Sequence, residues 1–532
     1  MRRFLISTLS SSASRRGSAY HHLNDGYAFS GSRTMFSDRA VPQQDTGHKL
    51  AWQVNMRKNC RYMSNLTNPP DTIISYNESN LKGEEKDAVR IKVITREHIK
   101  PSSPTPQSHR YYKFSMFDQV QVPIYHPLMV FYTNNDSKNI EEVISDRSNH
   151  LKQSLSEALT RMYPFAGKLA SELHIDCNDD GVYYVETRVN DRLNNVLQKP
   201  DHKFLQRLIP VVDSIPNQPL SCSYVSMIQV NFFKCGGVSI IFQNNHKLAD
   251  GNSTMTFMRT WAAIARRDPN QIYPNFVPSQ MFPQNPQLPY LPYIPLWYMA
   301  VSPVCIKHGK CETKRFCFDV LALQELKAKA SKHQPVSRVA AVLALLWKCV
   351  TTATYSKPSF LHMPVNIRQR FSPALNEYSI GNVLSGASVR FDPGASNLEL
   401  ASMASNLKNA IADSKGGSID ELKGENAHVR FVDSLRKSME MVTDFKSEYY
   451  LAASMCNSKS NEIDFGWGKP VWVCSGNQLN DDVPLFTNRM MLMDSCSSDG
   501  IEAWVTLEKE VMDVVKCNAE LLSFTSVDPS PL

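Results

Sequence analysis

One short stretch carries residues suited to proton transfer: His246, followed four positions later by the Asp250-Gly251 pair. The apolar run before it, residues 237–242, predicts a buried strand that ends near the histidine. After it, apolar residues recur at three- and four-residue spacing over 255–265, which predicts a helix capped by Asp250, Ser253 or Thr254. An imidazole titrates near neutral pH, so a histidine on a connection between two rigid elements is suited to general acid–base catalysis.

A second stretch, Asp464-Phe465-Gly466-Trp467-Gly468, combines glycines with aromatic residues. The glycines permit a tight backbone path, and the rings can anchor a loop in a core. We therefore expect Asp464 to support a structural turn and not to transfer a proton itself. The His-x-x-x-Asp spacing alone is not specific, because His21 and Asp25 share it; a packing or capping role for His246 stays open on local context alone.

Taken together, the two stretches resemble the HxxxD and DFGWG motifs of the plant BAHD acyltransferases, which lie at this separation in that family. The resemblance covers about Asp87 to Leu532. Within the family, the chain resembles the alkaloid-acetylating branch. Further matching segments are Pro101–Pro106, Tyr163–Gly167, Ile175–Gly181, Val365–Arg368, Gly381-Asn382 and Asp499–Trp504. Residues before 87 have no counterpart.

The resemblance implies an α/β (α+β) fold of two chloramphenicol-acetyltransferase-like domains, each a mixed sheet with flanking helices, with a solvent channel between them. A length of 532 residues agrees with more than one domain. The predicted domains are 87–268 and 312–532, joined by a proline-rich crossover at 269–311 that we expect to be extended and unpacked. Residues 1–86 are expected to be disordered and to represent either a transit peptide or an over-extended reading frame.

Hydrophobic periodicity predicts the main elements of both domains. They are a strand from Val89, a helix at about 148–162, a strand at Val182–Val189, a strand near Lys314–Val320, a helix from Ser337, a helix over 400–411, and a C-terminal hairpin of 489–493 and 501–505.

Roles for the site residues follow from the resemblance. It implies that His246 is the general base, that Asp250 pairs with Arg368 to hold the histidine loop, and that Asp464 supports its own loop and the domain arrangement. It implies structural support of the site by Gly251, Gly466 and Gly468. Ser337 and Arg338 match a region near CoA at a predicted helix start, where a simple helix cap is the alternative.

Composition excludes several other classes. The net charge of +7 is mild and its basic residues are scattered, so no nucleic-acid partner is expected, although an anionic ligand would suit it. Twelve cysteines without a Cys-x-x-Cys pair favour free thiols and no metal site. Prolines interrupt the most apolar stretch, Tyr290–Ile306, so no membrane span is expected. We expect a cytoplasmic monomer, or a mitochondrial or plastid protein if the transit peptide is real.

The sequence thus predicts an acyl-CoA-dependent O-acyltransferase without a permanently bound cofactor, which transfers an acetyl group from acetyl-CoA to a hydroxyl of a plant specialised metabolite such as a monoterpenoid indole alkaloid. Another alcohol, a phenolic or an amine acceptor stays open, as does a non-catalytic binding protein that retains the fold. A serine hydrolase is disfavoured because no Gly-x-Ser-x-Gly elbow is present. A peptide-condensation domain would carry a second histidine where this chain has Asn245.

Overall fold

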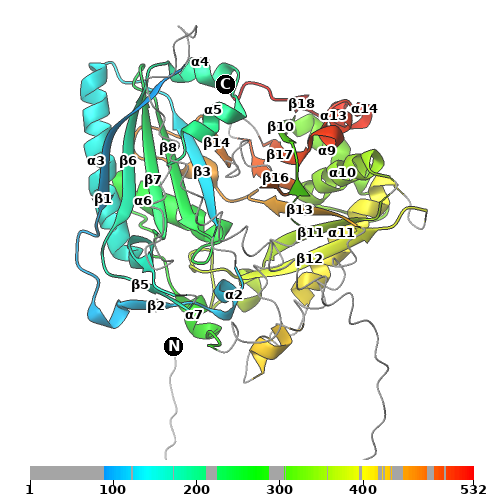
Figure 1. The fold of residues 1–532 in the computed structure, drawn as a ribbon, viewed down its shortest axis with the longest axis horizontal. Coiled ribbons are helices and arrows are strands. Elements are labelled where there is room, and N and C mark those ends of the chain that lie inside the picture. Colours follow the sequence, from blue (N-terminus) through cyan, green and yellow to red (C-terminus); the bar gives the residue numbers. More distant parts are fainter. Residues whose placement is uncertain are drawn as a thin grey trace, which may run out of the picture. The chain divides into compact units, whose positions relative to one another are not determined.

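The computed structural model describes two mixed sheets with helices packed against them (Figure 1), in agreement with the predicted α/β class. All described residues belong to one compact unit. They are 89–121, 124–171, 173–210, 224–286, 305, 307–355, 357–394, 398–416, 422, 426–431, 433, 447–475, 485–495 and 499–532. The disorder predicted for 1–86 falls outside them.

The first sheet has six strands and supplies the element that ends at His246. Its order is β1 (Ile91–Ile99), β6 (Val182–Val189), β7 (Ser226–Phe233), β8 (Val238–Asn245), β3 (Tyr125–Tyr132) and β14 (Trp472–Ser475). Only β6 and β7 run parallel; the other neighbours are antiparallel. Every residue of β7 and β8 is buried, which explains why the run before His246 is continuously apolar instead of alternating.

The second sheet has seven strands from the C-terminal part of the chain. Its order is β12 (Leu384–Phe391), β11 (Ser359–Asn366), β13 (Glu448–Ser454), β16 (Arg489–Asp494), β17 (Ile501–Glu508), β10 (Cys311–Phe318) and β18 (Ser526–Val527). The predicted hairpin is confirmed, because β16 and β17 pair antiparallel with Met491 opposite Trp504. Two small sheets complete the pairing: β2 (Tyr111–Lys113), β5 (His174–Asp176) and β4 (Lys168–Leu169), and β9 (Lys307–His308) with β15 (Leu485–Phe486).

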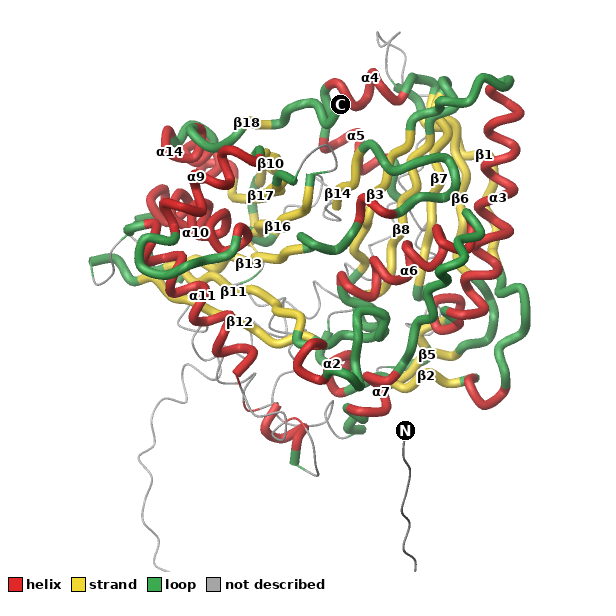
Figure 2. Tube along the Cα trace, turned by 180° about the vertical axis from the view of Figure 1, so that it is seen from behind, coloured by secondary structure: helices red, strands yellow, loops and turns green. Residues whose placement is uncertain are grey.

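Long helices pack on each sheet. The first sheet carries α3 (Ile140–Arg161) and α6 (Gly251–Ala265), which contact each other; the second carries α9 (Val320–Ala330), α10 (Arg338–Ala353), α11 (Leu400–Gly416) and α13 (Lys509–Val515) (Figure 2). The short helices are α2 (Met116–Gln119), α4 (Leu193–Gln198), α5 (His202–Arg207), α7 (Val277–Met281) and α14 (Ala519–Leu522). The helix expected at 148–162 begins earlier, because Asn139 caps it. No helix among the described residues is long and apolar enough to cross a membrane.

One strand does not follow the order of the chain. Although β14 lies late in the sequence, it pairs antiparallel with β3 at the edge of the first sheet, with Trp472 opposite Phe131. The predicted division into 87–268 and 312–532 stays a prediction, and β14 is a piece of the second range that completes the first sheet.

Part of the crossover after residue 268 is packed, which corrects the expectation of an extended and unpacked segment for the residues around α7. It contains α7, and Phe282 is buried beside Phe117 and Phe371, at ring-centroid distances of 5.0 and 4.9 Å. These rings belong to a small apolar cluster of residues from both halves of the chain. The cluster joins the halves near the histidine loop.

Candidate functional site

The loop from His246 to Asp250 is fixed at both ends. The main-chain N–H of His246 donates to the carbonyl of Ile124, at 2.8 Å, directly after β8 ends. Asp250 caps α6 by accepting a hydrogen bond of 2.9 Å from the N–H of Ser253. Asp250 is thus the cap among the three candidates. The first helical residue is Gly251. A Cβ added there would lie in ordinary van der Waals contact with Met455, at 3.5 Å.

The His246 ring lies in an environment that favours its neutral form. Its Nδ1 is buried and has no hydrogen-bond partner among the described residues, and the His126 ring packs edge-on against it at 5.0 Å. Burial lowers the pKa of His246, while the nearby Asp250 carboxylate acts in the opposite direction. A neutral imidazole is the form that can accept a proton.

This electrostatic setting predicts the pH dependence of the reaction. A base whose pKa lies below 6.5 stays neutral, and therefore active, at pH values where an ordinary histidine would already be protonated. We expect kcat/KM for acyl transfer to fall on the acid side with a midpoint below 6.5, the ordinary histidine value. A kcat/KM profile of the free enzyme checks this, and an acid limb at or above the ordinary histidine pKa would contradict it.

Asp250 is not available for proton transfer, because both of its carboxylate oxygens accept hydrogen bonds from Arg368. The guanidinium donates to the two carboxylate oxygens at 2.7 and 3.0 Å, which is the contact that the resemblance implied. Burial alone would raise the pKa of Asp250, but the Arg368 charge and hydrogen bonds hold it below its ordinary value. Arg368 also donates to the carbonyls of Ser379 and Gly381, at 3.1 and 2.6 Å. This ion pair ties the start of α6 to the segment after β11.

A second network, which the sequence analysis missed, holds the main chain of the histidine. The Asn382 amide donates to the carbonyl of His246 and to the Asp118 carboxylate, both at 2.8 Å. Asp118 also caps α2 through a reciprocal pair with Ser115. Burial raises the pKa of Asp118 to about 6. Segments more than one hundred residues apart are thereby joined through Asn382, which holds the main chain at His246.

Ser337 and Arg338 lie at the N-terminus of α10, as predicted. Ser337 caps the helix by accepting from the N–H of Ala340, at 3.1 Å, and its side chain is exposed. Arg338 donates to the carbonyl of Asp499, at 2.5 Å. These contacts are those of a helix cap, and no described contact brings either residue to His246.

The Asp464 loop packs on the first sheet's helices, away from His246. The Asp464 carbonyl accepts from Arg266, which directly follows the C-terminal end of α6, and Phe465 packs edge-on against Trp261. Since α6 begins beside the histidine and rises about 1.5 Å per residue over 15 residues, the loop lies roughly 20 Å from His246. The structure does not bring this loop together with the histidine.

Within the Asp464 loop, the carboxylate closes the turn on itself. One oxygen accepts from the N–H groups of Gly466 and Gly468, at 2.8 and 2.9 Å. Gly466 and Gly468 have φ angles of 103° and 105°, in a region that residues with a Cβ adopt only at an energetic cost. Asp464 and these glycines therefore form one turn.

Removing this carboxylate should destabilise the protein without changing the reacting groups. We expect Asp464→Ala to lower the free energy of unfolding by about 1–3 kcal/mol, because two N–H groups lose their acceptor. The pH profile of the remaining activity should match that of wild type. Thermal unfolding and pH profiles check both statements, with Asp464→Asn, which keeps one acceptor oxygen, as the control. A shifted pH profile in Asp464→Ala would show instead that the carboxylate takes part in proton transfer.

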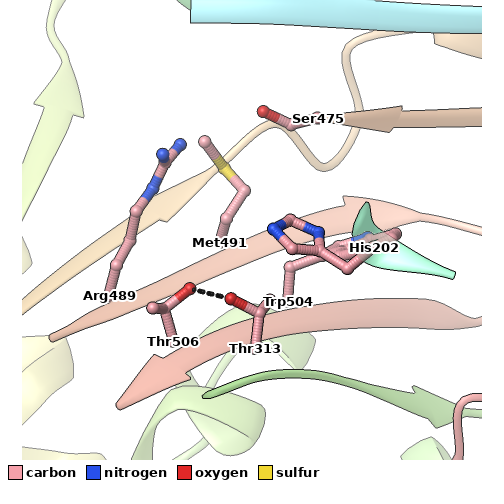
Figure 3. Close-up of a pocket in the computed structure, with 7 residues that line it drawn as sticks. All are labelled: His202, Thr313, Ser475, Arg489, Met491, Trp504 and Thr506. Atoms are coloured by element: carbon pink, nitrogen blue, oxygen red, sulfur yellow. Dashed lines mark hydrogen bonds between the residues drawn. The ribbon is translucent and has the colours of Figure 1, made fainter. Parts of the chain in front are cut away.

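A small cavity lies between the two sheets (Figure 3). Its lining comes from both halves of the chain: His202, Thr313, Ser475, Arg489, Met491, Trp504 and Thr506. Arg489 lies close enough to His246 and His126 to lower the pKa of both rings. The cavity is therefore electrostatically coupled to the histidine, although His246 is not part of its lining.

Two mixed sheets with helices on each, and a histidine loop tied to segments of both halves of the chain, agree with a fold of two sheet-containing domains. The chain belongs to the BAHD acyltransferase family, since the family model described as "Transferase family" matches residues 89–522. The chain is therefore an acyltransferase.

Individual relatives agree with this assignment. A limonoid 7-O-acetyltransferase of Citrus sinensis is 34% identical over 461 residues, covering 83% of this chain and 99% of the relative. Akuammiline synthase 1 of Alstonia scholaris is 33% identical over 447 residues, covering 82% and 97%. Among solved structures, vinorine synthase is 29% identical with a TM-score of 0.68, covering 83% of this chain and all of that one.

Proposed function

We propose that this enzyme transfers an acetyl group from acetyl-CoA to a hydroxyl of a polycyclic specialised metabolite. The acceptor class is a terpenoid or indole alkaloid alcohol, as suggested by relatives named for limonoid O-acetylation and akuammiline synthesis. The observation that carries the proposal is the neutral His246 ring, held between the two halves of the chain by Asn382 and, through Asp250, by Arg368.

In the proposed reaction, His246 acts as a general base. The imidazole takes the proton of the acceptor hydroxyl while the oxygen attacks the thioester carbonyl carbon of acetyl-CoA. A new C–O bond forms and the C–S bond breaks, so the acetyl group leaves on the acceptor. The imidazolium returns its proton to the CoA thiolate, which restores the neutral ring. No acyl-enzyme is required.

Asp250 and Asn382 support this step without touching the reacting atoms. Asp250 is committed to Arg368 and to the cap of α6. Asn382 holds the carbonyl of His246, so the main chain that carries the ring is fixed by a buried hydrogen bond. Ser337 and Arg338 remain the proposed contacts for CoA, supported by the exposed N-terminus of a 16-residue helix, whose partial positive charge suits a phosphate.

An acceptor panel tests the proposal. Purified enzyme is incubated with acetyl-CoA and one alcohol from a set of limonoid, indole alkaloid, phenolic and fatty alcohols, and products are identified by mass spectrometry. We expect free CoA thiol to appear only when an acceptor is present, with an acetyl ester of a polycyclic alcohol as the product. Acetylation of phenolic or fatty alcohols alone would overturn the acceptor class.

A further inference from the structure

Asp118 is a fully buried carboxylate whose two oxygens hold two different parts of the chain. Its Oδ2 accepts from the N–H and the hydroxyl of Ser115, at 2.8 and 2.7 Å, and so belongs to the cap of α2. Its Oδ1 accepts from the N–H and the side-chain amide of Asn382, at 2.7 and 2.8 Å, so that α2 lies beside the start of β12 (Figure 1). The cap uses only the first of these oxygens, so it does not account for the second.

The main chain around Asn382 is held independently by the first turn of α6. The Ser253 hydroxyl donates to the carbonyl of Gly381, at 2.9 Å, and accepts from its N–H, at 3.1 Å. On the other side of Asn382, the N–H of Val383 donates to the Asp250 carboxylate, at 3.3 Å. The backbone is therefore tied on both sides of Asn382, and the part of this residue that depends most on α2 is its side-chain amide.

Three acceptors around Nδ2 of Asn382 decide which way this amide points. They are the Asp118 carboxylate and the carbonyl of His246, both at 2.8 Å, and the carbonyl of Lys247, at 3.3 Å. A carboxylate and two carbonyls can only accept, so this end of the amide is the NH2 group and the opposite end is the oxygen. Asp118 is the only charged acceptor of the three and therefore makes the strongest of these hydrogen bonds.

The oxygen of the same amide can supply the partner that the His246 ring lacks. Asn382 Oδ1 and His246 Nδ1 are both buried, and neither has a hydrogen-bond partner among the described residues. Burial lowers the pKa of His246, whereas the Asn382 side chain acts in the opposite direction, as an amide oxygen facing a ring N–H does. A hydrogen-bond acceptor at Nδ1 keeps the ring proton there, which leaves the lone pair of Nε2 free to take a proton from the substrate hydroxyl.

We infer that Asp118 is a positioning residue for acyl transfer, which acts through Asn382: its carboxylate holds the amide so that the amide oxygen faces Nδ1 of the His246 ring. Asp118 itself does not touch the reacting atoms. The inference rests on the proposed acyl transfer and adds how the proton-accepting nitrogen of the base is selected. Loss of Asp118 should therefore lower kcat and leave the binding of both substrates nearly unchanged.

Turnover of matched variants tests the route through Asn382. Asp118→Ala should lower kcat by about 10–100-fold, as expected for one charge-assisted hydrogen bond, with both KM values nearly unchanged. Asp118→Asn keeps one oxygen that can face Asn382 and should regain most of kcat. Asp118→Ala combined with Asn382→Ala should lose no more than Asn382→Ala alone, because the route is already broken. The control is Asp319→Ala, which removes the exposed carboxylate that caps α9 and should keep wild-type kcat. Wild-type kcat in Asp118→Ala, or losses that multiply in the double variant, would overturn the inference.

The position of the ring proton gives a second readout that needs no turnover. Nitrogen NMR of the full chain with isotope-labelled histidine distinguishes protonated from unprotonated ring nitrogens, and His246→Ala identifies the His246 signals. Above the pKa of the ring, we expect the wild-type proton on Nδ1 and a mixture of both tautomers in Asp118→Ala. A wild-type proton on Nε2 would refute the inference even if the variants failed to fold, as would an unchanged spectrum in Asp118→Ala. Absence of acetyl transfer with the proton on Nδ1 would count against the proposed function and not against the role of Asp118.

Discussion

His246→Ala should lower kcat for acyl transfer by about 10²–10⁴-fold, the usual contribution of a positioned general base. Without the imidazole, the acceptor hydroxyl must attack as the neutral alcohol or lose its proton to water. The ring also packs edge-on against His126 and interacts with the Asn382 side chain, so the Tm should fall as well. Release of CoA thiol and mass spectrometry of the product measure the loss.

The matched control for this experiment is His109→Ala, which removes an exposed imidazole far along the chain. It should retain wild-type turnover. The affinity of His246→Ala for acetyl-CoA, measured by calorimetry, should also be unchanged, which separates loss of chemistry from loss of binding. Wild-type turnover in His246→Ala would refute the base assignment and would favour a non-catalytic role for the histidine.

Asp250→Ala should be among the most destabilising single substitutions, at about 3–5 kcal/mol, because it leaves the Arg368 charge buried and unpaired. The cap of α6 is lost at the same time, which adds about 1 kcal/mol. Urea unfolding measures the change. Asp146→Ala, which breaks an exposed pair with Lys138, is the control and should cost about 1 kcal/mol or less.

A double substitution isolates the cause of this loss. Asp250→Leu with Arg368→Met removes both charges and should recover much of the stability lost in Asp250→Ala, since no buried charge remains. It should not recover activity, because the histidine loop loses its tie to the segment after β11. Equal stability of the single and double variants would mean that the ion pair is not the source of the loss.

The local elements of the site could be predicted, because their signals are local. Runs of apolar residues predict the strand β8 and the helix α6. The Asp250 carboxylate, directly before the helix, predicts its N-cap. The helix α7 was missed because the many prolines of 269–311 predicted an extended segment, whereas proline is tolerated in the first turn of a helix, as at Pro278.

What could not be predicted depends on contacts between distant segments. Ser115-x-x-Asp118 carries the local pattern of a capping box, so a cap could have been found there. The bond from Asn382 to Asp118 joins residues 264 positions apart, and no pattern within one sequence indicates it. The cavity between the sheets is lined by residues of the second sheet and of β14, so it emerges only when these segments are packed together.

The position of β14 has a consequence for how ligands enter. This strand leaves the second half of the chain, hydrogen-bonds to β3, and then the chain returns to β16 in the second sheet. The chain therefore crosses between the two sheets twice, and separating the sheets would stretch both connections. The opening available to entering substrates is therefore limited by these two crossings of the chain.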